Sequence, residues 1–574
     1  MGHKAVYIET FGCQMNELDS ELVTGQLAGL GYRFTADPER ADVVLYNTCS
    51  VREHAEQKVW SRLGELKARK AQRPGMVVGV LGCMAERDGV DLIRRMPIVD
   101  ILCGPGELDR LPALLDNAVR TRGAMLGEGE GGGAGARSTD RSANQVALQG
   151  NGSRRSATLA AAQDSLELLD LSRAISPTDH HGSAYVRITR GCNKFCTYCV
   201  VPFTRGAEIH RPPEHILDEC RRLADAGVVE VTLLGQTVNH YRFEHGAAVT
   251  TGGITLAQKG RPYAGARRDA RAGRRVTTFA DLLGLIHEKV PAIRRLRFVT
   301  SYPRDLGDDV LETIRDCPRI CRYLHVPAQT GSNDILAAMN RGYSIEQYLE
   351  FLDRARGVLD QPEIGRPLMV SGDIIVGFPG ETEEDYRATV RLLERAGYKN
   401  CFIFKYSPRP GTVAFGRMGD DVSEATKRRR NNELLEIQAR ISDRISREQI
   451  GRTFDVLVEG PSKRSLKRSG LAGSRPRTNG AVALTVGGTE PTDGMGARQA
   501  DRRLDGLGAH PTDGHDRLGA APGVQLAGRT DGDLIVFFDA PPRGPLRPDD
   551  WAGRIVPVAI TDADQRSLFG EPIN

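Results

Sequence analysis

Short apolar runs alternate with longer amphipathic stretches along the first 120 residues. The apolar runs cover Ala5–Ile8, Asp42–Tyr46 and Met76–Leu81, and helix-type patterns near Glu17–Leu30 and Glu53–Lys70 separate them. Short apolar runs indicate buried strands, and strands that alternate with helices are typical of a parallel sheet. The pattern therefore predicts a small parallel α/β domain over residues 1–120.

A cysteine follows each of these apolar runs. The three are Cys13, Cys49 and Cys83. Because open parallel sheets bind ligands outside the carboxyl ends of their strands, the three thiols are expected to converge on one site. The alternative, that each is a small buried hydrophobe, explains one such cysteine better than it explains three at equivalent strand ends.

The alternation of strands and helices returns after a Gly-, Ala-, Ser- and Arg-rich stretch. We expect residues 121–182 to form a flexible linker with one short helix at Ser165–Leu171. Residues 183–450 then favour an open or partial (β/α)6 barrel with its site at the carboxyl ends of the strands. The expected strands are Tyr185–Thr189, Glu230–Leu234, Leu296–Thr300, Tyr323–Val326, Asp373–Val376 and Phe402–Tyr406.

The last part of the chain changes character. A charged helix is expected over Glu424–Ile450, and its run Lys427–Arg430 is a candidate for phosphate contact. β-like pieces follow at Thr453–Glu459, Leu534–Phe538 and Arg554–Ile560, which predicts a small β-barrel within residues 451–574. Two segments, a basic one at about 244–277 and a polar one at about 462–523 that we expect to be disordered, are predicted insertions.

Composition narrows the class of protein. The chain has 574 residues, eleven cysteines and a formal charge of +4, and no apolar run reaches the length of about 18 residues that a membrane span needs. The N-terminus lacks the shape of a secretory signal. These features predict a soluble, cytoplasmic protein of several domains without membrane association, whose cysteines are kept reduced.

Three further cysteines stand close together in the chain. Cys192, Cys196 and Cys199 form a C-x3-C-x2-C triplet at the end of the first expected barrel strand. An electron-transfer [4Fe–4S] cluster normally takes four cysteines. A set of three suggests an iron that is open to a small molecule. A tetrahedral zinc ion is the alternative metal for such a group of cysteines.

This triplet and its neighbours resemble the methylthiotransferase family of radical S-adenosylmethionine enzymes. The matching runs are Cys192–Gly206, Gly12–Asn16, Asn47–Lys58, Leu233–Tyr241, His325–Ser332 and Asp373–Glu381. The runs around Cys13 and Cys49 are most similar to the branch that modifies tRNA. The resemblance covers nearly the whole chain apart from three insertions.

The resemblance implies a set of cofactors and partners. It implies two [4Fe–4S] clusters, on Cys13, Cys49 and Cys83 and on Cys192, Cys196 and Cys199, with S-adenosylmethionine bound at the second. It further implies S-adenosylmethionine contacts at Gly235, Gln236, Gly377 and Gly380, a small RNA-binding TRAM barrel at the C-terminus, an electron donor such as a flavodoxin-type reductase, and a monomer.

The implied reaction is transfer of a methylthio group to C2 of N6-isopentenyladenosine beside the anticodon of tRNA. Two related reactions remain as alternatives: methylthiolation of threonylcarbamoyl-adenosine in tRNA, and methylthiolation of an aspartate of a ribosomal protein. A simple iron–sulfur electron carrier is a third class, but it would need neither a barrel nor an RNA-binding module.

Overall fold

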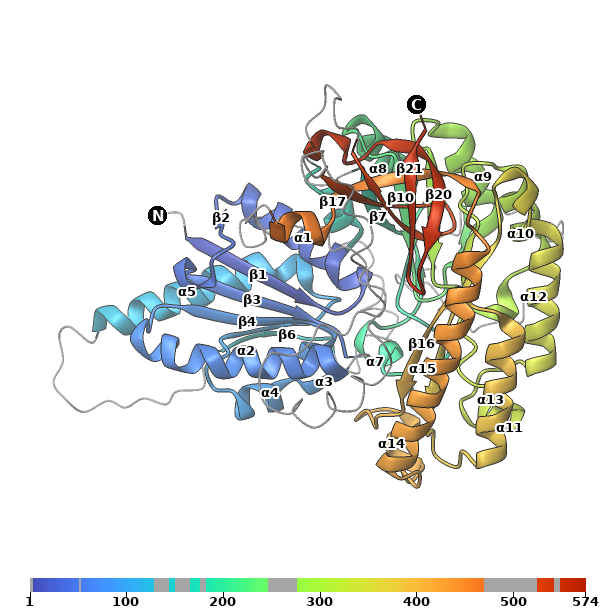
Figure 1. Cartoon of the computed structure of the whole chain (residues 1–574). Coiled ribbons are helices and arrows are strands. Elements are labelled where there is room, and N and C mark those ends of the chain that lie inside the picture. The colour runs from blue at the N-terminus through green and yellow to red at the C-terminus, as the bar shows by residue number, and fades with distance from the viewer. Residues whose placement is uncertain are drawn as a thin grey trace.

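The computed structural model describes residues 4–50, 53–128, 144–149, 166–175, 182–245, 276–468, 524–540 and 548–573. Its N-terminal part is a six-stranded parallel sheet in the order β2-β1-β3-β4-β5-β6, drawn in blue in Figure 1. The strands are β1 (Ala5–Phe11), β2 (Arg33–Phe34), β3 (Val43–Thr48), β4 (Val77–Gly82), β5 (Ile101–Cys103) and β6 (Gln145–Ala147). The helices are α1 (Gln14–Gly29), α2 (Glu53–Gln72), α3 (Cys83–Asp88), α4 (Val90–Arg95) and α5 (Leu111–Glu128).

Alternate side chains of the central strands enter two different cores. Val43 and Leu45 of β3 pack in a core with residues of α1 and α5, whereas Val44 and Tyr46 pack with residues of α2. Every residue of β3 and β4 is buried. A parallel sheet covered on both faces requires continuous apolar strands of this kind, which is the predicted parallel α/β fold.

The segment predicted as a linker over residues 121–182 contains ordered structure wherever it is described. Helix α5 continues to Glu128, and β6 pairs with β5 as the sixth strand. A helical run follows at 166–171, whose Glu167 and Asp170 are buried. The partners in these contacts are far away in the sequence. The local composition does not reveal them, so it indicated a loop.

The second part is the expected partial barrel. Its strands are β7 (Ser183–Arg187), β10 (Glu230–Leu234), β13 (Arg295–Val299), β14 (Tyr323–His325), β15 (Met369–Val376) and β16 (Asn400–Lys405). They form two parallel three-stranded sheets, β13-β10-β7 and β14-β15-β16, and an isolated bridge between Leu296 and Ile320 adjoins their junction. The outer helices are α8 (Pro213–Asp225), α9 (Phe279–Lys289), α10 (Asp308–Asp316), α12 (Ile345–Leu359), α13 (Glu383–Ala396) and α15 (Glu424–Arg447).

The C-terminal part is a closed five-stranded barrel, whose first strand is orange and whose other strands are red in Figure 1. Its strands are β17 (Thr453–Pro461), β18 (Gln525–Arg529), β19 (Ile535–Asp539), β20 (Ile555–Ala563) and β21 (Ser567–Pro572). Three of these were predicted from the sequence with slightly different ends, and β18 and β21 were not. Helix α16 (Lys463–Arg468) lies at the start of the predicted polar insertion.

Basic side chains connect this small barrel to the amino-terminal ends of the larger barrel's strands. Arg297 donates to the carbonyl oxygen of Asp531 over 2.9 Å and to Glu230 over 2.8 Å, and Lys399 lies 2.7 Å from the carboxylate of Asp533. All these side chains except that of Asp531 are at least nine-tenths buried. The C-terminal barrel therefore closes one end of the larger barrel.

Several expectations for the basic segments change with the structure. Lys427 and Arg430 are buried and pair with Asp420 and Glu381, so half of the predicted phosphate-binding run is internal. Most of the insertions at 244–277 and 462–523 lies outside the described residues.

Among the described helices, none combines the length and the apolar character needed to cross a membrane.

Candidate active site

The structure brings the three N-terminal cysteines to one end of the sheet. Cys13 caps the start of α1 after β1, Cys49 follows β3, and Cys83 begins α3 directly after β4. Gly12 lies so close to Cys49 that a Cβ on Gly12 would stand 2.5 Å from the Cβ of Cys49. Because Gly12 also has a φ of +144°, a glycine is required where these two loops meet.

Two asparagines hold the loops in this arrangement. The Cys13 thiol donates to Asn16 Oδ1 over 3.2 Å, and Asn16 Nδ2 donates to Asn47 Oδ1 over 3.0 Å. Asn47 in turn donates to the carbonyl oxygen of Asn16 over 2.8 Å. Both asparagines are completely buried. Since buried amides need all their partners, this pair fixes the loop after β1 against the end of β3.

The second triplet lies in the loop after β8 (Thr189–Arg190), at the carboxyl end of the barrel. The backbone N–H of Lys194 approaches Cys192 Sγ at 3.5 Å, and Arg341 Nη1 approaches Cys196 Sγ at 3.4 Å. Burial raises the pKa of Cys199 to about 12, and Cys196 adds to the effect. The Cys199 thiol therefore keeps its proton until a metal replaces it.

The two triplets face each other across the junction between the N-terminal domain and the barrel. Helix α3, which begins with Cys83, packs against α7 (Val201–Thr204), which follows Cys199 by one residue. Cys83 is close enough to Cys199 to add to the rise in the Cys199 pKa. Two ligand sets that are far apart in the sequence therefore lie at one interface.

Arg205, from the segment that follows the second triplet, lies beside Cys83 and Cys13 of the first. Its guanidinium donates to Asp19 over 2.9 Å, and its side chain is 7% exposed. Burial opposes its charge, but Cys83, Asp19 and Cys13 together keep the pKa of Arg205 above its ordinary value. By the same interaction, Arg205 favours the thiolate form of Cys83.

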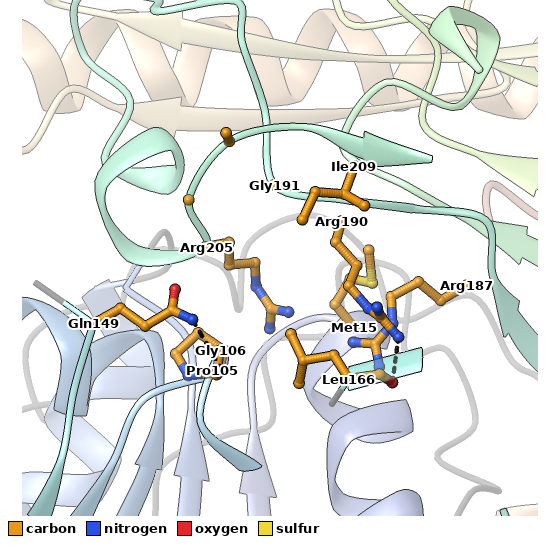
Figure 2. A pocket seen from close by; sticks show the side chains of 12 residues that line it. Met15, Pro105, Gly106, Gln149, Leu166, Arg187, Arg190, Gly191, Arg205 and Ile209 are labelled. Carbon is orange, nitrogen blue, oxygen red and sulfur yellow. Dashed lines mark hydrogen bonds between the residues drawn. The ribbon is translucent and has the colours of Figure 1, made fainter. Parts of the chain in front are cut away.

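A cavity of about 30 Å³, close to the share of one water molecule, lies beside Arg205 (Figure 2). Its lining includes Met15 of α1 together with Arg187, Arg190 and Arg205 of the barrel. In Figure 2 the three arginines extend from the barrel segments towards the N-terminal domain. Asp19 and Asp170 pair with them, so the interface is ionic and buried.

The spacing of the thiols distinguishes between zinc and a cluster. Four sulfur ligands around one zinc ion stand about 3.8 Å apart, given Zn–S bonds of about 2.3 Å. Among the residues the structure describes, neither cysteine triplet has all three sulfur atoms within 4.8 Å of one another. In the structure, neither triplet is therefore arranged as a preformed site for a single zinc ion.

The four residues expected to contact S-adenosylmethionine differ in how many of their hydrogen-bonding groups are free to bind a ligand. The backbone N–H groups of Gly235, Gly377 and Gly380 donate to Val299, Glu381 and Asp421 respectively. Gln236 is half-buried, and no hydrogen bond of its side chain occurs among the described residues. Gln236 therefore has the most capacity for a ligand, and the three glycines mainly shape turns.

Sequence reasoning missed Arg205, Arg341 and Lys194 as members of the site. Arg341 also donates to the carbonyl oxygen of Pro327 over 2.9 Å, and Lys194 pairs with Asp305. The position of Arg205 and Lys194 inside the motif Cys192–Gly206 was an available signal. Arg341, 142 residues after Cys199, had none.

Comparisons with known proteins identify the family to which the chain belongs. Residues 5–104 match the Uncharacterized protein family UPF0004, and residues 186–393 match the Radical SAM superfamily. A tRNA-2-methylthio-N(6)-dimethylallyladenosine synthase of Rhodopirellula baltica is 39% identical over 567 residues, which covers 99% of this chain and 95% of the relative. The corresponding synthase of Bacteroides fragilis is 39% identical over 466 residues, covering 81% of this chain and 86% of the relative.

One solved structure with a related arrangement is a radical S-adenosylmethionine methyltransferase from Kitasatospora setae. It shares 15% identity, with a TM-score of 0.45, over 72% of this chain and 77% of that one.

The partial barrel and its three-cysteine loop place the protein in the class of radical S-adenosylmethionine enzymes. Its cofactors are [4Fe–4S] clusters and S-adenosylmethionine. The chain belongs to the family of tRNA-2-methylthio-N(6)-dimethylallyladenosine synthases, and it is a methylthiotransferase.

Proposed function

We propose that the protein adds a methylthio group to C2 of N6-isopentenyladenosine in tRNA, at the base on the 3′ side of the anticodon. The observation that carries the proposal is the meeting of the two cysteine triplets, Cys13, Cys49 and Cys83 with Cys192, Cys196 and Cys199, at one buried interface. Sulfur insertion needs a sulfur donor and a carbon radical in the same place, and positioning is the protein's main contribution to such chemistry.

Each triplet is proposed to hold one [4Fe–4S] cluster. When bound, the cluster on the barrel loop would supply the electron that cleaves one S-adenosylmethionine, and the N-terminal cluster would supply the site from which sulfur is delivered. A second S-adenosylmethionine would supply the methyl group. Arg205 and Arg341 stabilise the thiolate ligands, because each guanidinium lies beside a cysteine of one triplet. Gln236 is the proposed side-chain contact for S-adenosylmethionine.

The carboxyl ends of the central barrel strands supply polar groups for the base. His325 is fixed from both sides, with Nδ1 2.6 Å from Thr300 Oγ1 and Nε2 3.2 Å from Asp373 Oδ1. Val370, Ile374 and Val376 of β15 pack in the core under the outer helices, so Asp373 faces the inside of the barrel. The adenine ring is proposed to lie near this group.

Exclusion of water is the other task of the chain. The C-terminal barrel closes the amino-terminal end of the larger barrel through Arg295, Arg297 and Lys399. Covering this end removes one route by which water could reach a radical intermediate.

The proposed partners follow from the reaction. The tRNA anticodon loop presents an unpaired base that can enter the barrel. The electron is proposed to come from a flavodoxin-type reductase, and the protein is proposed to act as a monomer in the cytoplasm, where tRNA is modified.

The test compares three acceptors under anaerobic conditions with the reconstituted enzyme. They are tRNA carrying isopentenyl-adenosine beside the anticodon, the same tRNA without the isopentenyl group, and a ribosomal protein. We expect methylthio product, detected by mass spectrometry of nucleosides, from the first alone. The names of the relatives favour this acceptor over the two alternative reactions.

The matched control is Cys192→Ala, which removes one ligand of the barrel loop and should abolish 5′-deoxyadenosine formation with every acceptor. Equal product from the prenylated and unmodified tRNA would contradict the specificity, and product on the ribosomal protein alone would contradict the proposed substrate class.

A further inference from the structure

A group of side chains that the proposed reaction does not use lies next to the loop that carries Cys192. Glu208 and His210 belong to the segment that returns from the loop, in which β9 (Ile209–His210) pairs with β8. His240 ends the turn η5 (Val238–His240) that follows β10. One potential ligand atom of each side chain lies within 4.8 Å of the others, and no other group of this kind occurs among the described residues.

Glu208 is the centre of the group. Its side chain is 2% exposed, and its two oxygens accept from Thr237 Oγ1 over 2.9 Å and contact His240 Nδ1 at 2.6 Å. Among the described residues, His240 is the only basic side chain that pairs with Glu208. A buried carboxylate is costly unless a positive charge balances it, and a bound metal cation would supply that charge.

His210 provides the second, independent observation. Its Nδ1 atom is buried and has no hydrogen-bond partner among the described residues. Its ring lies 6.1 Å from the ring of His240 and 5.7 Å from that of Tyr241, centre to centre, in edge-on contacts. An unpaired buried nitrogen costs about 1–3 kcal/mol, whereas a metal bond would use its lone pair.

We propose that Glu208, His210 and His240 bind one divalent transition-metal ion, zinc by its donor set. Two imidazole nitrogens and one carboxylate oxygen are typical zinc ligands, and a water molecule or Thr237 can complete the tetrahedron. Magnesium and calcium prefer oxygen ligands, so they do not suit a group with two imidazoles. Zinc bonds of about 2.0–2.2 Å place neighbouring ligand atoms about 3.3 Å apart, so the 2.6 Å contact between His240 and Glu208 has to widen when the ion binds.

The ion would join two segments beside the cluster loop. The backbone N–H of Glu208 donates to Asn193 Oδ1 over 3.2 Å, and Asn193 follows Cys192 directly. His240 belongs to the turn whose Asn239 donates to the carbonyl oxygen of Tyr302 over 2.8 Å. The zinc ion therefore fixes the base of the Cys192 loop against the ends of β10 and β13, without taking part in electron transfer.

The experiment measures zinc and iron together in the full-length enzyme with both clusters reconstituted. After addition of zinc and removal of the excess by gel filtration, we expect about one zinc ion per chain in addition to about eight iron ions. His210→Asn and His240→Asn should lower zinc at least tenfold and leave iron unchanged. His287→Asn is the matched control, because His287 also has a buried Nδ1 without a partner among the described residues but lies outside the group.

Cobalt serves as the second probe, because empty cysteine sites also bind zinc. Cobalt added to the cluster-loaded enzyme should give tetrahedral d–d absorption without the thiolate-to-cobalt charge transfer that cysteine ligands produce. His210→Asn should abolish the d–d bands, and His287→Asn should keep them. Zinc absent from the wild-type enzyme, zinc that persists in His210→Asn and His240→Asn, or a thiolate cobalt spectrum would each overturn the proposal.

Discussion

Arg205 Nη2 donates a hydrogen bond to Asp19 Oδ2 over 2.9 Å, and this bond joins the barrel to the N-terminal domain beside Cys13 and Cys83. Asp19 also accepts from Arg187 over 2.8 Å, so its charge stays balanced if Arg205 is replaced. This redundancy separates the electrostatic role of Arg205 from a role in folding.

Arg205→Met should weaken the N-terminal cluster selectively. Loss of the cation raises the pKa of Cys83, so thiolate ligands form less readily and the iron content falls from about eight towards about four per chain. Arg205→Lys keeps the charge and should keep most of the iron. Iron analysis and electron paramagnetic resonance of the reduced protein provide the measurement, and a full iron content in Arg205→Met would contradict this role.

Replacement of Cys192, Cys196 and Cys199 together by Ala should remove half of the iron and sulfide. The wild-type protein is expected to contain about eight iron and eight sulfide ions after anaerobic reconstitution, because each triplet is proposed to hold one cluster. The control is Cys103→Ala, since Cys103 is buried in the N-terminal core and belongs to neither triplet. Stoichiometric zinc in place of iron at the triplets would refute the assignment.

Cys13→Ala, Cys49→Ala and Cys83→Ala should each separate the two activities. The barrel loop remains complete in these variants, so 5′-deoxyadenosine should still form, whereas the methylthio nucleoside should disappear. Both products are measured in the same reaction by liquid chromatography and mass spectrometry. If cleavage of S-adenosylmethionine also stops while the barrel cluster is intact, the division of labour is wrong.

A purely structural role for these cysteines predicts a different result. It predicts a lower melting temperature of each cluster-free variant relative to the cluster-free wild type. We expect little change, because their loops are held by Asn16 and Asn47.

Asp533→Asn should loosen the C-terminal barrel and change its response to acid. Burial opposes ionisation of Asp533, but Lys399, Arg529 and Arg297 hold the pKa of its carboxyl below the ordinary value. Its stabilising contribution is therefore complete at neutral pH and is lost as the pH falls below about 4, the pKa in the unfolded chain. The substitution leaves Lys399 with a buried, uncompensated charge and should cost about 3 kcal/mol at pH 7.

Thermal unfolding at pH 7 and at pH 4 and below checks this prediction. The melting temperature of the wild type should fall more steeply with acid than that of Asp533→Asn. Parallel pH profiles would show that Asp533 does not carry this acid sensitivity. Removal of everything after Ile450 would expose Arg295, Arg297 and Lys399, so it should also disturb the larger barrel.

The sequence by itself determined the order of the elements, because hydrophobic periodicity and turn signals act over a few residues. Strand Glu230–Leu234 has the predicted ends, and Cys13, Cys49 and Cys83 follow strands as expected. Contacts between distant segments were decided by the tertiary structure. Glu167 and Asp170 are buried against barrel arginines, and Lys427 and Arg430 form internal ion pairs. Glu208 lies together with His210 and His240. Each of these contacts depends on side chains that folding brings together. A charged residue is placed inside a protein only by the partner that balances it, and local sequence does not identify that partner.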